Sequence, residues 1–455
     1  MNAHHKSDHR LFDVIGRTVP RYTSYPTAPH FTTAVDGEVY DGWLKSAGRA
    51  DDPVSLYLHI PFCRSICHYC GCATKATRRD EPISAYACVL RTEIARVARS
   101  LGRVRVSHIH WGGGTPNLLP AADFAAVMSD LDRLFDLSTL AEHAIELDPR
   151  HLTRSGARFL AGIGVNRASL GVQDFDPEVQ IAIGRVQPLE QVEEAVAALR
   201  LAGISAINFD LIYGLPLQTL ASIRRTAMHA AGLAPSRIAL FGYAHVPWFR
   251  PHQKLIDDGA LPGAATRLDL ARIARETIDA FGYEAIGIDH FARPEDDLTL
   301  ARDARQQKRN VQGYTTDTAT VLVGFGATSI GRTPMGYAQN ATAVGAWTRA
   351  VEEDRLPTER GRALTADDRL RADVIEQLLC YFDVDLAAVA ARHGAAPDAL
   401  VADIAKLAPL VAEGWVVVEG ARVAIVDHGA ELARVVASAF DAYLTEGSAR
   451  HSVAV

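Results

Sequence analysis

The chain has 455 residues, of which 48% are hydrophobic and 22% are charged, as in a well-packed globular protein of roughly two to three domains. Its net charge of −7 argues against a nucleic-acid-binding protein, because phosphate groups need a basic face. No segment approaches the ~18 consecutive apolar residues of a spanning helix, and the N-terminus lacks an apolar signal segment. We therefore expect a cytoplasmic protein that makes no membrane contact.

The first 35 residues follow neither a helical nor a strand pattern. The segment PRYTSYPTAPHF, residues 20–31, has many Pro, Thr and aromatic residues, which disfavour a helix. Residues 1–35 are therefore predicted to form an extended arm.

From about residue 54 the chain repeats a short apolar run, a polar or glycine-rich corner and an amphipathic helix. The apolar runs are 54–60, 106–111, 143–147, 167–172, 206–214, 237–245 and 284–291. Helical spacing is clearest at Leu90, Ile94, Val97 and Leu101, and at Val192, Val196 and Leu199. This alternation predicts an α/β fold, with a parallel sheet closed or partly closed as a barrel over residues 36–360.

Polar residues gather where these predicted strands end, which is where such barrels carry their chemistry. They are the cysteine-rich loop after the first run, GGGTP at 112–116, Glu146 and Asp148, Gln173 and Asp174, and Asp210.

After about residue 360 the pattern changes. Residues 364–382 and 385–394 predict helices, and WVVVEGARVAIV at 415–426 predicts a hairpin. We expect a separate domain over 361–455 that is mostly helical and carries a small β-wing.

Four of the six cysteines lie within ten positions, at Cys63, Cys67, Cys70 and Cys72. In a reducing compartment such a group is more typical of a metal site than of disulfides. The first three, spaced C-x3-C-x2-C, suit one inorganic cluster. A zinc site completed by Cys72 with His59 or His68, and a cluster ligated by all four cysteines, remain open. Cys88 and Cys380 are predicted to be inert core residues.

The segment YLHIPFCRSICHYCGC, residues 57–72, resembles the cluster loop of radical S-adenosylmethionine (SAM) enzymes, and in particular that of the oxygen-independent coproporphyrinogen III dehydrogenase family. Further blocks similar to that family span nearly the whole chain, among them PRYTSYPTA, HWGGGTPN, IELDPR, INFDLIYGLP and GYAQN. The resemblance implies a radical SAM fold, a partial TIM-like parallel barrel. It also implies a [4Fe-4S] cluster on Cys63, Cys67 and Cys70 whose fourth iron binds SAM, with Cys72 nearby, needed for activity but not ligating iron.

The resemblance also implies that two SAM molecules bind each chain. The first is expected to contact Tyr57, Gly113, Glu146 and Ile330, and the second Tyr69, Gly114, Thr115, Gln173, Arg185, Asp210 and Ala244. For Arg185 and Asp210 the alternative is a structural ion pair. Tyr57 and Cys72 are the expected catalytic residues.

The implied reaction converts the ring A and ring B propionates of coproporphyrinogen III to vinyl groups, with loss of carbon dioxide, and gives protoporphyrinogen IX. Arg21 and Tyr22 are the expected substrate contacts. Further candidate cations for the substrate carboxylates are Arg250, His252, Lys254, Arg309 and Arg332. The arm is expected to close over the substrate as a lid.

The family further implies a monomer that receives electrons from a donor such as flavodoxin or ferredoxin. Three alternatives remain: an anaerobic haem-degrading radical SAM enzyme, a haem-binding chaperone of similar ancestry, and a zinc protein. The chaperone is disfavoured by Phe62 and Cys72, since that group typically has a tryptophan before the first cysteine and no Cys-Gly-Cys.

Overall fold

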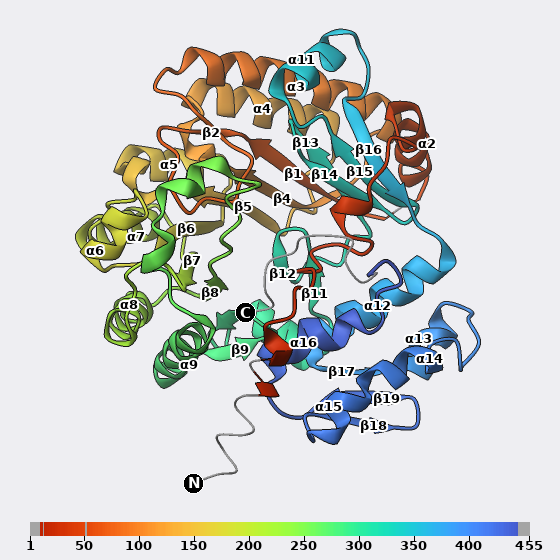
Figure 1. The fold of residues 1–455 in the computed structure, drawn as a ribbon. Coiled ribbons are helices and arrows are strands. Elements are labelled where there is room, and N and C mark those ends of the chain that lie inside the picture. The colour runs from red at the N-terminus through yellow and green to blue at the C-terminus, as the bar shows by residue number, and fades with distance from the viewer. Residues whose placement is uncertain (1–9, 12, 51, 445–455) are drawn as a thin grey trace.

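Six parallel strands form the centre of the computed structural model, which describes residues 10–11, 13–50 and 52–444 (Figure 1). They are β1 (Val54–Ile60), β4 (Val106–Gly113), β5 (Glu142–Leu147), β6 (Arg167–Gln173), β7 (Ala206–Tyr213) and β8 (Arg237–Gly242). Each coincides with a predicted apolar run, and β1 has the predicted bounds. The predicted α/β fold with a parallel sheet is confirmed.

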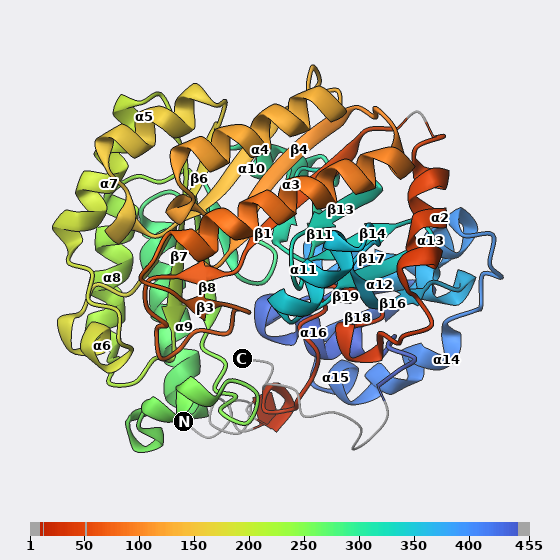
Figure 2. The same ribbon diagram turned by 90° about the horizontal axis from the view of Figure 1, so that it is seen from above.

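Helices cover the outer face of these strands (Figures 1 and 2). They are α3 (Glu81–Leu101), α4 (Ala121–Leu134), α5 (Arg154–Gly162), α6 (Pro177–Ala182), α7 (Leu189–Leu201), α8 (Leu220–Gly232) and α9 (Ala264–Ala280). The periodic residues predicted for α3 and α7 are all buried. Cys88 was predicted to be a core residue, and this is wrong: it lies on the exposed side of α3.

The seventh apolar run does not form a parallel strand. It forms two short antiparallel strands, β9 (Glu284–Ile286) and β10 (His290–Ala292), with β10 next to β8. The chain reverses at Gly287, whose φ is +56° and whose missing side chain makes room for the ring of Tyr314. The short helix α10 (Asp297–Asp303) follows.

At the opposite edge the sheet continues through four strands that the sequence did not reveal. They are β13 (Val321–Phe325), β14 (Ile330–Thr333), β15 (Gly336–Asn340) and β16 (Thr358–Ala363), with α11 (Val344–Glu352) between the last two. β13 runs parallel to β1, whereas the other three are antiparallel to their neighbours. A separate hairpin of β11 (Lys308–Asn310) and β12 (Gly313–Thr315) precedes them.

The predicted C-terminal domain lies beside this added part of the sheet (Figure 1). Its helices are α12 (Ala366–Tyr381), α13 (Leu386–Arg392), α14 (Val401–Ile404), α15 (Ala408–Ala412) and α16 (Gly429–Ser438). The predicted hairpin is confirmed as β18 (Val416–Glu419) and β19 (Arg422–Ile425), and β17 (Asp383–Asp385) adds a third strand. The predicted boundary at 360 falls inside β16, so we propose that this domain starts at Leu364.

The arm packs into the core of the C-terminal domain and leads into α2 (Gly37–Ala47). Leu11, Ile15 and Val19 are buried in that core, and the hydroxyl of Tyr22 donates to Oδ2 of Asp441 at 3.0 Å. The arm is thus part of the domain's packing. Its residues 1–9 and 12 lie outside the described residues.

A buried carboxylate joins α3 to the corner between β13 and β14. Glu93 is 1% exposed and accepts hydrogen bonds from Gly326 N (2.7 Å), Trp347 Nε1 (3.0 Å) and Asn340 Nδ2 (2.6 Å). Burial raises the pKa of Glu93 to about 7, although the three donors oppose this.

The raised pKa of Glu93 predicts a pH-dependent stability. Between pH ~4.5 and ~7 the folded chain holds the proton more tightly than the unfolded chain, so the free energy of unfolding falls as pH rises, by about 3 kcal/mol for this group. Glu93→Gln is expected to flatten that slope in urea unfolding between pH 5 and 8. Glu81→Gln, on the exposed side of the same helix, is the control. Equal slopes in wild type and Glu93→Gln would contradict the assignment.

Candidate active site

The four clustered cysteines lie in one closed loop that follows β1. The short strands β2 (Phe62–Cys63) and β3 (Lys75–Ala76) pair in parallel and close the loop. From outside, the imidazole of His252 bonds Cys70 O at 2.7 Å, and Arg250 Nε donates to Gly71 O at 2.8 Å. Arg250 and His252, two candidate substrate contacts, thus hold the backbone of the cysteine loop.

Each of the first three sulfurs receives a hydrogen bond. Thr115 Oγ1 donates to Cys63 Sγ (3.3 Å), Arg185 Nη1 to Cys67 Sγ (3.6 Å), and the Cys72 backbone N–H to Cys70 Sγ (3.4 Å). Arg150 Nη2 lies 3.9 Å from Cys67 Sγ. Hydrogen bonds to sulfur and nearby positive charge stabilise an anionic iron–sulfur cluster, so this donor set fits a [4Fe-4S] group.

The cysteine thiols differ in acidity. The hydrogen bond from the Cys72 thiol lowers the pKa of Cys70 to about 6, whereas burial raises the pKa of Cys63 to about 11. The hydrogen bond to Cys70 raises the pKa of Cys72 well above its ordinary value. The Cys72 backbone N–H lies 3.4 Å from Cys70 Sγ, so Cys72 is an immediate neighbour of one of the three expected cluster ligands.

The two histidines considered for a zinc site have other partners. His59 is instead engaged with the Tyr57 hydroxyl at 3.0 Å and with Ala73 O, and His68 with Ala182 O.

The three glycines of GGGTP allow the chain to pack against itself. A Cβ at Gly113, whose φ is +113°, would lie 2.7 Å from His59 Cε1, and one at Gly114 would lie 2.5 Å from Phe62 O. A Cβ at Gly112 would lie 2.8 Å from Oε1 of Glu146. The corner therefore fixes the end of β4 against β1 and the cysteine loop.

Two carboxylates of the site face the barrel interior. Glu146 on β5 accepts from the Gly113 N–H at 3.1 Å and lies 3.3 Å from His110 Nε2. Burial alone would raise the pKa of Glu146, but hydrogen bonds from His110 and Gly113 lower it overall. Burial and the nearby charge of Glu146 raise the pKa of Asp210 on β7 to about 6. This concentration of negative charge suits the sulfonium and amino groups of SAM.

Arg185 and Asp210 were considered as a possible ion pair, but they have different partners. Arg185 pairs with Asp148 at 3.4 Å and donates to Gly171 O at 2.7 Å, whereas Asp210 Oδ2 accepts from Ser169 Oγ at 3.2 Å. Arg150 also binds Asp148, at 2.7 Å. Arg185 is thus positioned by Asp148 beside Cys67, and Asp210 has no cation within ion-pair distance in the described part of the chain.

The remaining predicted contacts lie at the same ends of the strands. Gln173 ends β6 at φ +70°, where the register with β7 shifts, and this unusual conformation points to a functional position. Tyr69 lies among Arg185 and the cysteines. Ala244 follows β8, its carbonyl accepting from Gln253, and Ile330 begins β14.

A cationic group lies at the end of β8. Arg21 of the arm donates to Gly242 O at 3.1 Å, close to Arg434 of α16, Arg267 and the carboxylate of Asp289. Burial lowers the pKa of all three guanidinium groups. This excess of positive charge suits substrate carboxylates. Arg434 gave no signal in the sequence because it occupies an ordinary helical position.

Sequence reasoning also missed His110 and Arg150. His110 belongs to the block HWGGGTPN and Arg150 to IELDPR, and both blocks also contain predicted site residues at the ends of strands. Their presence in these blocks was the signal that could have identified them.

Membrane-spanning helices were not found: no helix in the described ranges has the length and apolar composition needed to cross a bilayer.

The chain is similar to known proteins over nearly its whole length. The family model for the Radical SAM superfamily matches residues 57–230, and that for the HemN C-terminal domain matches residues 364–432. The oxygen-independent coproporphyrinogen III oxidase of Bradyrhizobium diazoefficiens is 50% identical, over 96% of this chain and 97% of its own. The enzyme of that name from Paracoccus denitrificans is 44% identical, over 98% of each chain.

A solved structure shows the same fold. The coproporphyrinogen III oxidase HemN from Escherichia coli, described as a radical SAM enzyme, superposes with a TM-score of 0.89 at 36% identity, covering 94% of this chain and 100% of that one. The fold is therefore the radical SAM barrel with a helical C-terminal domain, and radical SAM proteins carry a [4Fe-4S] cluster and use SAM. The chain belongs to the oxygen-independent coproporphyrinogen III oxidase family.

Proposed function

We propose that this chain converts coproporphyrinogen III to protoporphyrinogen IX without oxygen, by oxidative decarboxylation of the ring A and ring B propionates. The observation that carries the proposal is the three-cysteine loop in which Cys63, Cys67 and Cys70 each accept a hydrogen bond, next to the carboxylates of Glu146 and Asp210. Membership of the family supplies the substrate class.

Cys63, Cys67 and Cys70 would hold the cluster. When bound, the cluster and SAM supply the electron and the hydrogen-abstracting group that the reaction needs. Thr115, Arg150 and Arg185 stabilise the sulfurs through hydrogen bonds and charge. Cys72 is proposed to lie beside the cluster without ligating it, with its backbone N–H donating to Cys70 Sγ.

The carboxylates and the arm bind and orient the reactants. Glu146 stays ionised and is proposed to accept from the SAM amino group, with Tyr57 beside it. Asp210, with Tyr69, Gly114, Thr115, Gln173, Arg185 and Ala244, is proposed to hold a second SAM. Arg21 and Tyr22 are proposed to contact the substrate, although the Tyr22 hydroxyl is already engaged with Asp441.

We further propose that the chain acts as a monomer in the cytoplasm, with flavodoxin or ferredoxin as electron donor. All six cysteines are unpaired, as expected in a reducing compartment.

The proposal is tested by anaerobic incubation of the reconstituted protein with coproporphyrinogen III, SAM and a reductant. We expect protoporphyrinogen IX, two carbon dioxide and SAM cleavage products. Haem binding without any product would instead indicate a carrier and would overturn the proposal.

A further inference from the structure

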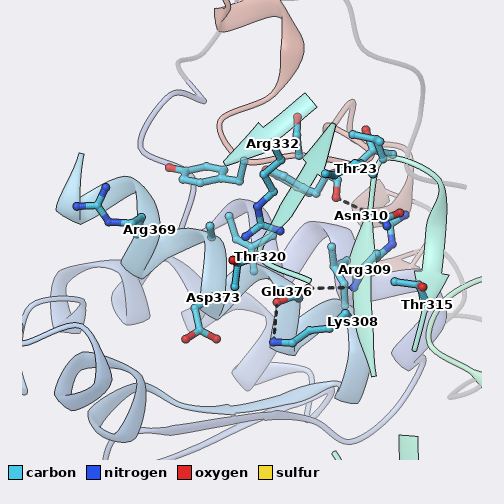
Figure 3. A pocket seen from close by; sticks show the side chains of 18 of the residues that line it. Thr23, Lys308, Arg309, Asn310, Thr315, Thr320, Arg332, Arg369, Asp373 and Glu376 are labelled. Carbon is cyan, nitrogen blue, oxygen red and sulfur yellow. Dashed lines mark hydrogen bonds and ion pairs between the residues drawn. The ribbon is translucent and has the colours of Figure 1, made fainter. Parts of the chain in front are cut away.

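A large cavity lies between the barrel sheet and the C-terminal domain, outside the residues assigned above to the cluster. Its volume is about 580 Å³, and β14, the arm, the β11–β12 hairpin and α12 line it (Figure 3). Ile330, an expected SAM contact, and Tyr22 both line it.

The sheet register places this cavity on the same face as the cluster site. Tyr57 lies opposite Gly324 on β13, and Leu322 lies opposite Arg332 on β14. Ile330 is therefore level with Gly324 and lies two strands from Tyr57, about 10 Å away at ~4.8 Å per strand. Residues opposite one another share a face of the sheet, so Ile330 and Arg332 both point to the side occupied by Tyr57.

Most charged groups of the cavity are already paired. The engaged cations are Arg305 with Asp383, Lys308 with Glu376, Arg309 with the carbonyl of Tyr22, Arg369 with that of Leu364, and Arg392 with Asp373. The lining carboxylates Asp317, Asp373 and Glu376 all have partners as well.

Arg332 differs from the other cations. Its side chain extends into the cavity from β14 and makes no hydrogen bond or ion pair with any part of the chain that the structure describes (Figure 3). Arg332 is exposed, and its unpartnered guanidinium offers a planar pair of N–H groups that matches a carboxylate. The apolar side chains of Leu322, Ile330 and Leu379 beside it would cover a macrocycle.

We infer that this cavity forms part of the tetrapyrrole site and that Arg332 binds the carboxylate of a propionate other than the one being decarboxylated. The inference rests on the proposed function for the identity of the substrate. The bound carboxylate is not the reacting one. Ile330 is level with Tyr57 across the sheet, whereas Arg332 lies two residues further along β14.

Direct binding tests the inference without turnover. Coproporphyrinogen III is equilibrated anaerobically with the full chain, without SAM or reductant, and bound ligand is quantified after oxidation to the fluorescent porphyrin. Arg332→Gln is expected to raise Kd by about 10- to 100-fold, because a charge-assisted hydrogen bond is lost. The Kd of Arg332→Lys is expected to lie between those of wild type and Arg332→Gln, because lysine keeps the positive charge but lacks the planar pair of N–H groups.

Two controls isolate the carboxylate. Arg360→Gln, on the edge strand β16 and hydrogen-bonded to Gln339 of β15, should leave Kd within about twofold. The tetramethyl ester of the substrate should bind wild type and Arg332→Gln equally, because no carboxylate remains. An unchanged Kd in a folded Arg332→Gln variant, or an equal loss with the ester, would overturn the inference. Wild-type turnover reports separately on the proposed function.

Discussion

Replacing Cys63, Cys67 or Cys70 with serine is expected to abolish both the iron–sulfur centre and turnover. The three sulfurs come from one loop, and each has a hydrogen-bond donor, so removing one leaves a cluster with too few protein ligands. Iron and acid-labile sulfide after anaerobic reconstitution should fall from about four per chain to well below one. Product formation should fall below detection.

Cys72 and Cys88 make this experiment decisive. Cys72→Ser is expected to retain iron and sulfide but lose turnover, because Cys72 is proposed to lie beside the cluster without ligating it. Cys88→Ser, on the exposed side of α3, should change neither quantity. If Cys72→Ser loses iron as completely as the other three, Cys72 is a fourth ligand and the cluster has no open position for SAM.

The parallel strands could be predicted from the sequence because each buries a row of apolar side chains. Val54, Leu56, Leu58 and Ile60 alternate along β1 and are all buried, and such runs stand out against the amphipathic helices between them. The run 284–291 was also predicted to be such a strand, but Gly287 reverses the chain beneath Tyr314. A reversal that depends on a partner 27 residues away leaves little trace in local composition.

The strand β15 was missed for a related reason. GYAQN shows no alternation of apolar and polar residues, yet all five of its residues are buried. Gln339 and Asn340 can be buried because Gln339 accepts a hydrogen bond from Arg360 and Asn340 donates one to Glu93. Buried polar residues whose hydrogen-bond partners are distant in sequence are indistinguishable, from the sequence alone, from the polar residues of a loop.

The site shows the same division. The cysteines and strand-end carboxylates of the site could be predicted from motif and position, but the ion pairs between its charged residues could not. An ion pair between Arg185 and Asp210 was the alternative to SAM binding, whereas in the fold Arg185 pairs with Asp148. Arg332 was one of several candidate cations, and only the pairing of its neighbours singles it out.

Removing residues 10–30 is expected to unfold the C-terminal domain as well as abolish turnover. Leu11, Ile15, Val19, Tyr22 and Tyr25 are all at most 5% exposed and share one core with that domain. Burying such side chains contributes about 1.5–3 kcal/mol each, so the deletion removes on the order of 10 kcal/mol. That approaches the whole stability of a typical domain, about 5–15 kcal/mol.

This expectation changes how the predicted lid must be tested. A deletion cannot separate closure over the substrate from packing of the domain, so point variants are needed. Arg21→Gln should lower kcat/KM by about 10- to 100-fold with unchanged thermal unfolding, because its charge faces the site and its hydrogen bond reaches only Gly242 O. Tyr22→Phe should instead lower the free energy of unfolding by about 1–2 kcal/mol, because the buried carboxylate of Asp441 loses a donor.

Thermal unfolding and limited proteolysis of the purified proteins measure these effects together. In the deletion variant, protease sites in α12–α16 should open well below the temperature at which the barrel unfolds, because the arm contacts that core directly. If the deletion variant unfolds at the wild-type temperature and only turnover is lost, the arm contributes no packing energy. In that case the arm acts as a lid alone.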